Sequence, residues 1–459
     1  MRRLLNSLLY LLLVLSYQAV SAQSAPPENK TQRELRVSAD GSHLVTGAGL
    51  PFFYLADTAW ELLHRCDEAE SRMYLKDRAA KGINVIQTVI LAELEGLTVP
   101  SANGHLPLRN LDPARPNEEY FQHVDAVVRL ADSLGLYLGL LPTWGDKFNK
   151  KWGVGPEVFT PENARTFGRF LGERYRNNNV IWILGGDRIP EEPEDFAIVR
   201  AMAAGLRAAV DRRQLITYHP QGGYKSSDYF PNDDWLDFHM FQSGHGGSGN
   251  KLDYKFPPEV LAEAPGKPVI NGEPCYEDHP INWRPVNGWF TDFDTRRAAY
   301  WSVLAGTAGH TFGNHSIWQM WQPGRAPISS ARTDWRTALR YPGVRQMGYL
   351  RRLMEGLPFW ELSPDADLFT AIPNSSGRET LVVRTQDTGL VIAYTPYGDR
   401  LEIRRDRLPG KVICSWFDPR SGNSIPFKAA QTEDMLLFDP PFEPAPGNDW
   451  VLVVRAEDR

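Results

Sequence analysis

The stretch Val180-Ile181-Trp182-Ile183-Leu184-Gly185-Gly186-Asp187 places five apolar residues directly before two glycines and an acid. A short, continuously apolar run is typical of a strand that is buried on both faces of a parallel sheet. The stretch Pro268-Val269-Ile270-Asn271-Gly272-Glu273 repeats this order of apolar run, glycine and acid. The two stretches therefore predict two buried parallel strands, each with a carboxylate at its carboxyl end.

Six more apolar runs of similar length lie along the chain, and segments with helical spacing separate them. The eight runs are 52–56, 84–90, 137–141, 180–184, 215–218, 236–241, 268–270 and 309–312. The helical segments are 68–81, 117–134, 161–176, 193–209 and 295–305. This alternation of strands and helices is typical of repeated βα units.

Eight such units predict an α/β fold, a (β/α)8 TIM barrel, over residues 34–354. The alternative is a doubly wound sheet, which usually carries a glycine-rich phosphate-binding turn after its first strand. Here the first run is followed by Asp57-Thr58-Ala59-Trp60, which contains no glycine. The barrel is therefore the favoured fold.

The pattern changes near residue 355. Short strand-like runs follow one another without helical segments between them, and turns rich in Gly, Pro, Asn and Asp separate them. These runs are 369–372, 380–384, 390–394, 412–417, 435–438 and 450–454. Residues 355–459 are therefore predicted to form a small C-terminal antiparallel β-sandwich.

The amino terminus has the features of an export signal. Arg2 and Arg3 precede a short apolar run at 8–15, and Val20-Ser21-Ala22 fits a cleavage site. We expect a signal peptide at 1–22, a flexible leader at 23–33 and a mature protein in the periplasm or on the surface of a bacterial cell. An uncleaved membrane anchor is the alternative, although the run is short for a membrane span and no later segment is long and apolar enough.

Composition excludes several classes of partner. The formal net charge of −6 argues against a nucleic-acid partner, which requires a basic face. The three cysteines, Cys66, Cys275 and Cys414, are odd in number and widely spaced, so they indicate neither a disulfide framework nor a metal site. The histidines show no HxH or HExxH pattern. We therefore expect no metal and no cofactor, and the sequence does not define an oligomeric state.

Barrel enzymes place their active sites at the carboxyl ends of the strands. The predicted strand ends are crowded with polar and aromatic side chains, which we take as candidate substrate-binding residues. They are Asp57, Gln87, Trp144, His219, His239, Gln242, Asn314 and His315. Asp57 fits a hydrogen bond to a substrate hydroxyl and a helix cap equally well, and the histidines fit hydroxyl binding or the orientation of a carboxylate.

Asp187 and Glu273 are the candidate catalytic pair. They lie 86 residues apart (273 minus 187), close to the roughly 94 residues of three barrel units. Glycoside cleavage uses one acid to protonate the leaving oxygen and one carboxylate to attack the anomeric carbon or activate water. The preceding glycines would let a ligand approach the backbone. A structural ion pair, such as Asp187 with Arg188, is the alternative for each acid.

Three stretches carry a family resemblance: Phe53-Tyr54-Leu55-Ala56-Asp57-Thr58-Ala59-Trp60, Trp182-Ile183-Leu184-Gly185-Gly186-Asp187 and Ile270-Asn271-Gly272-Glu273-Pro274. Together they resemble the apiosidase-like glycoside hydrolases of glycoside hydrolase family 140. The resemblance covers residues 34–350, and the remainder resembles the β-sandwich, named for collagen binding, that follows this barrel.

The resemblance implies that Asp187 is the acid/base and Glu273 the nucleophile. It also implies an exo-acting bacterial enzyme that releases apiose from rhamnogalacturonan-II, a branched pectin of plant cell walls. Most relatives of this barrel class carry Asn-Glu after the fourth strand, whereas this chain has Gly186-Asp187. The shorter acid leaves an inverting mechanism open beside the favoured retaining one.

Other functions remain open on the sequence. One is a glycosidase or endo-glycanase that acts on another plant cell-wall oligo- or polysaccharide. The other is a non-catalytic carbohydrate-binding barrel, although the presence of both carboxylates argues against it. The name of the C-terminal domain is no evidence of collagen binding, and packing against the barrel is its expected role.

Overall fold

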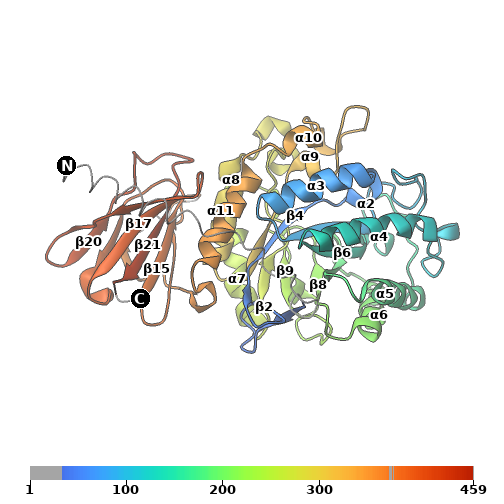
Figure 1. Ribbon diagram of the computed structural model, residues 1–459, viewed down its shortest axis with the longest axis horizontal. Coiled ribbons are helices and arrows are strands. Elements are labelled where there is room, and N and C mark those ends of the chain that lie inside the picture. The colour runs from blue at the N-terminus through green and yellow to red at the C-terminus, as the bar shows by residue number, and fades with distance from the viewer. Residues whose placement is uncertain (1–33, 372–374, 376, 458–459) are drawn as a thin grey trace, which may run out of the picture.

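The computed structural model describes residues 34–457 apart from 372–374 and 376. The signal peptide (1–22) and the leader (23–33) predicted from the sequence lie outside the described residues. Figure 1 shows an α/β part on the right and a β part, in red, on the left, with α8 and α11 between them.

Eight parallel strands form the central sheet of the α/β part, in the order β8-β7-β6-β5-β4-β11-β10-β9. They are β4 (Tyr54–Thr58), β5 (Val85–Leu91), β6 (Tyr137–Thr143), β7 (Val180–Gly185), β8 (Ile216–His219), β9 (His239–Phe241), β10 (Val269–Asn271) and β11 (Gly309–Phe312). The amide of Asp237 donates to the carbonyl of Ile216, which brings β9 beside β8. The sheet is thus a nearly closed barrel, and the predicted fold is confirmed.

Helices surround the strands, and all five predicted helices are present within three residues of their expected ends. The α-helices are α2 (Leu62–Arg65), α3 (Glu68–Ala80), α4 (Glu118–Ser133), α5 (Pro161–Tyr175), α6 (Pro193–Val210), α7 (Leu252–Glu263), α8 (Asp292–Leu304), α9 (His315–Trp318), α10 (Trp335–Ala338) and α11 (Gly343–Glu355). Among the longer helices, the prediction missed α11 and α7. Helix α7 contains Pro257 and Pro258, residues that usually interrupt a helix.

Short 3-10 turns occupy several loops. They are η2 (Arg109–Leu111), η3 (Gly145–Lys147), η4 (Ser226–Asp228), η5 (Ile281–Trp283), η6 (Pro285–Asn287), η7 (Ile328–Ser330), η8 (Phe359–Glu361) and η9 (Arg405–Arg407).

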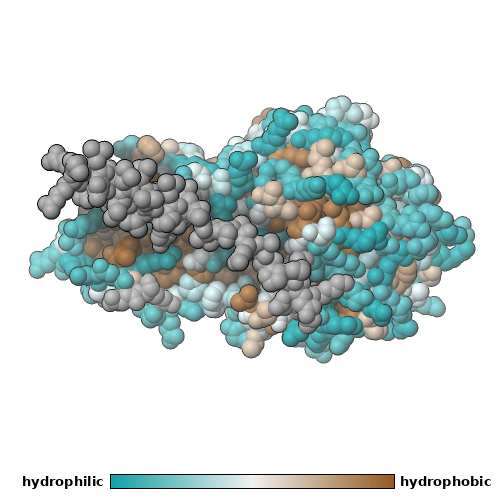
Figure 2. Space-filling model, in the orientation of Figure 1, coloured by the Kyte–Doolittle hydropathy of each residue, from teal (hydrophilic) through white to brown (hydrophobic). Residues whose placement is uncertain are grey.

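Local chemistry explains the position of the helices. At the start of α5, the Thr160 hydroxyl accepts from the amide of Asn163, and Pro161 occupies the first turn, where its missing N–H costs nothing. Helix α4 buries Phe121, Val124 and Val128 toward the strands. Its outer face and that of α3 are mainly hydrophilic in Figure 2. The helices therefore cover the barrel with one apolar face each.

A small antiparallel sheet closes the amino-terminal end of the barrel. It consists of β1 (Leu35–Val37), β2 (Leu44–Thr46) and β3 (Pro51–Phe52). Leu35, Leu44 and Phe52 belong to the same buried apolar cluster as the barrel residues Tyr137 and Leu215. Because this end is plugged by apolar packing, the open end of the barrel is the carboxyl end of its strands.

The C-terminal part is built from two antiparallel sheets, as predicted. One contains β12 (Ser363–Pro364), β14 (Leu381–Arg384), β15 (Leu390–Thr395), β21 (Trp450–Ala456), β17 (Val412–Asp418) and β18 (Asn423–Phe427). The other contains β13 (Phe369–Ala371), β16 (Leu401–Arg404), β20 (Met435–Phe438) and β19 (Ala430–Gln431). Side chains of both sheets, including Leu452 and Phe438, share one apolar core.

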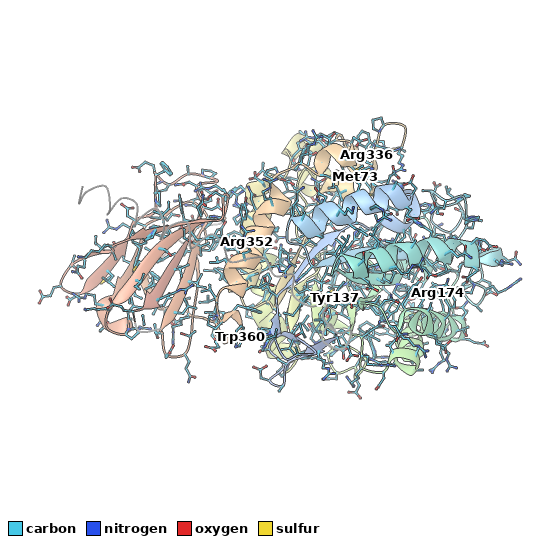
Figure 3. All side chains as sticks on the ribbon, in the orientation of Figure 1. Met73, Tyr137, Arg174, Arg336, Arg352 and Trp360 are labelled. Atoms are coloured by element: carbon cyan, nitrogen blue, oxygen red, sulfur yellow. The ribbon has the colours of Figure 1, made fainter. Side chains whose placement is uncertain are left out.

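The two parts are joined by a buried interface. The guanidinium of Arg296 on α8 donates to both carboxylate oxygens of Asp449, at 3.0 and 2.8 Å. The ring of Tyr300 stacks on that of Tyr394, with centroids 4.7 Å apart. Figure 3 places Arg352 of α11 on the side of the barrel that faces the sheets. No helix in the described part is long and apolar enough to cross a membrane.

Replacing Asp449 by Ala should destabilise the protein strongly, because it leaves the Arg296 guanidinium buried without this partner. Breaking a buried ion pair in this way costs about 3 to 5 kcal/mol. Denaturant unfolding of the full chain measures the change. Asp406, which pairs with Arg404 at the surface, provides the matched control. Asp449→Ala should lower the free energy of unfolding far more than Asp406→Ala, and equal effects would contradict the interpretation.

Candidate active site

A cavity of about 530 Å³ opens at the carboxyl ends of the strands. Carboxyl, amide and aromatic side chains from the segments that follow all eight strands line it. The lining residues are Trp60, Glu93, Leu94, Trp144, Trp152, Gly153, Val154, Asp187, Gln221, Gly222, Gln242, Gly244, His245, Glu273, Tyr276, Trp283, Trp318 and Ile328. Both predicted catalytic acids are among them.

Asp187 follows β7 in a left-handed backbone conformation, with φ of 54°. Gly185 before it has φ of 91°, and a Cβ at that position would lie 2.4 Å from the carbonyl oxygen of His219. Glycine is therefore required there by the close approach of β8. The sequence analysis expected glycine here so that a ligand could approach the backbone. In the structure, the close contact is with the protein's own backbone.

The environment of Asp187 favours its protonated form. Burial is the main cause, the negative charge of Glu273 adds to it, and together they raise the pKa of Asp187 to about 7. Arg188, whose Nη1 lies 3.5 Å from the carboxylate, and His219 oppose this change. A quarter of the Asp187 side chain is exposed, so it can reach a ligand in the cavity.

Glu273 follows β10 and lies between two imidazoles. Nε2 of His245 is hydrogen-bonded to Oε1 at 3.1 Å, and Nε2 of His219 lies 3.2 Å from Oε2. Burial alone would raise the pKa of this carboxyl. The hydrogen bonds and charges of the two histidines outweigh burial and lower the pKa to about 2. Glu273 is therefore held as a carboxylate.

A column of imidazole rings supports this arrangement. The ring of His279 stacks on His245 with centroids 4.1 Å apart, and His315 meets His279 edge-on at 4.4 Å. Burial lowers the pKa of His279 and lowers that of His315 to about 4. The amide of Gly244 donates to the Glu273 carbonyl, at 3.0 Å, which fixes the loop that carries His245. The column therefore holds His245 against Glu273.

Several predicted substrate-binding residues lie at or just behind the cavity wall. Trp144 and Gln242 line the cavity, and Nε1 of Trp144 and Oε1 of Gln242 have no hydrogen-bond partner among the described residues. His219 lies behind the wall against Glu273. Gln87 donates from Nε2 to the carbonyl of Gly272, at 3.0 Å, one residue before Glu273.

Other predicted binding residues lie outside the cavity. Asp57 is fully buried and forms an ion pair with Arg78 on α3, while the Tyr74 hydroxyl donates to it at 2.6 Å. This pairing differs from both roles considered in the sequence analysis, because the side chain points outward toward a helix. His239 is within 2.9 Å of the Ser226 hydroxyl, at the junction with η4.

Asn314 and His315 also face away from the cavity. The Asn314 side chain accepts from the amide of Ser316 and caps α9. Nε2 of His315 lies 3.1 and 3.0 Å from the carbonyl oxygens of Ile328 and Ser329. It thereby positions Ile328, which does line the cavity. These residues support the wall and do not face the ligand space.

The sequence analysis missed functional candidates in the loops. Trp152 and Trp283 are 58% and 50% exposed at the cavity, where an aromatic face can stack on a sugar ring. Trp152 also covers the guanidinium of Arg188 at 4.1 Å. Glu93 lies two residues after β5, and His245 lies in the glycine-rich loop that follows β9. Glu93 could have been predicted from the sequence, because it is an acid that closely follows an apolar, strand-like run.

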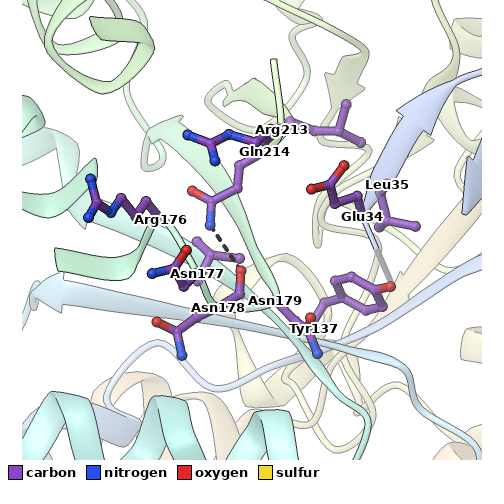
Figure 4. A pocket seen from close by; sticks show the side chains of 11 residues that line it. Glu34, Leu35, Tyr137, Arg176, Asn177, Asn178, Asn179, Arg213 and Gln214 are labelled. Atoms are coloured by element: carbon purple, nitrogen blue, oxygen red, sulfur yellow. Dashed lines mark hydrogen bonds between the residues drawn. The ribbon is translucent and has the colours of Figure 1, made fainter. Parts of the chain in front are cut away.

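A second, smaller pocket of about 120 Å³ lies at the amino-terminal side of the barrel, near the starts of β6 and β7. Figure 4 shows it lined by asparagines and arginines, with Nε2 of Gln214 donating to the carbonyl of Asn178 at 2.9 Å. Active sites of such barrels lie at the opposite end. Within the described residues, no group of three or more His, Cys, Asp or Glu side chains is placed to hold a metal ion.

Comparison with known families agrees with this geometry. The chain matches the family model "Apiosidase-like, catalytic domain" over residues 38–361, which span the barrel and both catalytic candidates. The chain belongs to the apiosidase-like family. The model "Putative collagen-binding domain of a collagenase" matches residues 364–455. The resemblance stated from the three sequence stretches is confirmed.

Apiosidase-like membership is accompanied by similarity to solved glycoside hydrolases. One glycoside hydrolase is 30% identical over 94% of this chain and 98% of its own length, with a TM-score of 0.84. A family 5 glycoside hydrolase from Bacteroides vulgatus is 29% identical over 93% of this chain and 94% of its own, also with a TM-score of 0.84. No curated protein matches the sequence significantly. Family and relatives identify the chain as a glycoside hydrolase.

In the apiosidase-like barrel, replacing Glu273 by Gln should lower the pKa of Asp187 below about 7, because the negative charge that helps to raise it is removed. Carbon NMR titration of the carboxyl groups measures this. The pKa of Asp253, also raised by burial to about 7 but outside the cavity, is the internal control and should not change. An unchanged Asp187 titration would show that the two carboxyls do not interact.

Proposed function

We propose that this protein is an exo-acting glycosidase that releases apiose from the side chains of rhamnogalacturonan-II. Asp187 would be its acid/base and Glu273 its nucleophile. The observation that supports the catalytic assignment is that two carboxyls in one cavity have pKa values shifted in opposite directions. The pKa of Asp187 is raised to about 7, and that of Glu273 is lowered to about 2. Pairs of carboxyls separated in this way are typical of acid and nucleophile roles.

The reaction would proceed in two displacements. The Glu273 carboxylate attacks the anomeric carbon while the Asp187 proton passes to the glycosidic oxygen, so the bond to the leaving group breaks as the glycosyl-enzyme ester forms. Asp187, now ionised, takes a proton from water, and the resulting attack on the anomeric carbon releases Glu273. Asp187 then carries its proton again, and the sugar keeps its anomeric configuration.

Action at the end of a branch is supported by the shape of the site. A second hollow of about 460 Å³ adjoins the cavity, and the two share Leu94, Val154 and Ile328. Val154 belongs to the same loop as Trp152, which packs on Arg188 beside Asp187. The second hollow therefore opens near the proton donor, where the leaving part of the substrate departs. One sugar in the cavity and the remaining glycan in the second hollow fit this division.

An acidic pectic glycan is supported by the charge of the second hollow. Arg65 and Arg325 both line it. The Arg325 guanidinium donates to the backbone carbonyls of Met320 and Arg65, and it forms no ion pair with a carboxylate in the described part of the chain. Its positive charge therefore remains available to a carboxylated sugar of the leaving chain.

Wild-type protein should release apiose from rhamnogalacturonan-II fractions, while Asp187→Asn and Glu273→Gln should reduce kcat by about 10²- to 10⁴-fold, the range expected for lost acid–base or nucleophilic groups. Wild-type activity should also fall as the pH rises above about 7, because Asp187 then loses the proton that it must donate. A panel of pectic fractions, analysed for released monosaccharides, measures both effects.

The matched control is Glu277→Gln. Glu277 is buried, and burial raises its pKa to about 7, but it does not line the cavity and accepts a hydrogen bond from the Gly343 amide. Its variant should keep activity. Release of another sugar with the same losses would retain the mechanism and reject the substrate. Glycan binding without any release would reject an enzyme and favour a binding protein.

A retaining mechanism predicts that the first product has the anomeric configuration of the substrate. Proton NMR, recorded during the first turnovers before mutarotation, distinguishes the two outcomes. The inverted anomer would show that Glu273 activates water and does not form an ester with the sugar. The assignment of Asp187 as the acid would be unaffected by that result.

A further inference from the structure

Glu93 is a third carboxyl group that lines the cavity, besides Asp187 and Glu273. It lies two residues beyond β5, between Ala92, which is buried, and Leu94, which also lines the cavity. The proposed reaction gives roles to Asp187 and Glu273 and leaves this third carboxyl without one.

The backbone around Glu93 is fixed on both sides. The amide of Leu94 donates to the buried carboxylate of Glu61, at 3.0 Å. The Glu93 carbonyl accepts from the amide of Glu95, at 2.9 Å, and from Nζ of Lys147, at 3.4 Å. The Glu93 side chain therefore starts from a fixed position in the cavity wall. A residue that binds a ligand needs such a fixed position.

The carboxyl of Glu93 differs from its acidic neighbours in having no protein partner. Asp146 pairs with Lys147 at 2.7 Å, and Glu61 binds His64 at 2.8 Å. For Glu93, no side-chain hydrogen bond and no ion pair with a described residue is present. Glu93 is partly buried. A partly buried carboxyl that lines a cavity and has no protein partner can still form hydrogen bonds with a ligand, which then supplies the missing partners.

We propose that Glu93 binds the substrate: its carboxyl group hydrogen-bonds a hydroxyl of the sugar that lies between Asp187 and Glu273, and so selects sugars that carry this hydroxyl. The inference rests on the proposed function for the identity of the ligand, although not for the presence of a sugar-binding cavity.

The electrostatic surroundings set the form in which Glu93 acts. Burial raises its pKa well above the usual range, and the negative charges of Asp187 and Asp146 add to this, while Arg188 opposes it. The protonated carboxyl has both an O–H donor and a carbonyl acceptor. Such a group can donate to one sugar oxygen and accept from a hydroxyl, which suits a neutral ligand better than a charged carboxylate would.

The test is calorimetric binding of rhamnogalacturonan-II side-chain oligosaccharides to Glu273→Gln protein, which holds the ligand without turnover, with and without changes at Glu93. Glu93→Ala should weaken binding about 10- to 100-fold, the effect of removing a hydrogen-bonding group from the ligand. Glu93→Gln keeps a donor and an acceptor and should stay within about threefold of the parent. The matched control is Glu162→Ala, since Glu162 is an exposed acid on α5 that lines neither the cavity nor the second hollow.

In the otherwise wild-type enzyme, Glu93→Ala should raise KM with a smaller change in kcat, and it should abolish discrimination against one of the deoxy analogues of the released sugar. Unchanged binding and unchanged discrimination in a folded Glu93→Ala protein would overturn the inference. If the wild type cleaves no fraction but Glu93→Ala still weakens binding, the proposed reaction fails and the inference stands. If the parent protein binds none of these glycans, both fail.

Discussion

The parallel hydrogen-bonded ladder of the barrel is the constraint on which the site depends. Every strand of a parallel sheet ends on the same side, and closure turns those ends into a ring. Gly185 of β7 is paired with His219 of β8, and Asn271 of β10 with Phe241 of β9. Asp187 and Glu273, separated by 86 residues in sequence, therefore enter one cavity within a residue or two of their strands.

Within that ring, Asp187 and Glu273 lie in different surroundings, which favour the protonated form of Asp187 and the ionised form of Glu273. Asp187 is partly buried and Glu273 is buried, and loss of solvent favours the neutral form of each. Glu273 is kept ionised by two imidazoles, and its charge then favours the proton on Asp187. The imidazole of His245 is itself held by His279 and His315. The two carboxyls are thus coupled, because the charge that Glu273 retains helps Asp187 to keep its proton.

The C-terminal sheets pack against the barrel but contribute no residue to the lining of the cavity. Their contacts are with the outer helices, through Arg296 and Trp301 on α8 and through Tyr254 on α7. All residues that line the cavity come from the segment between Trp60 and Ile328. The interface is a buried apolar and ionic contact, which accords with a packing role for this domain. The name of its family model carries no argument for a collagen partner.

The strands, the fold class and the positions of Asp187 and Glu273 at strand ends could be predicted from the sequence alone, because buried parallel strands are continuously apolar and glycine and an acid follow these two. The sequence could not determine which other strand-end residues face the cavity. Asp57 was expected there, but its partner Arg78 lies on α3, and only helix packing decides that it points outward. Four residues that line the cavity lie in loops: Glu93, His245, Trp152 and Trp283. A loop has no sequence periodicity from which the direction of a side chain can be predicted. The convergence of these four residues on the cavity was decided by the tertiary structure, which sets the path of each loop around the closed ring.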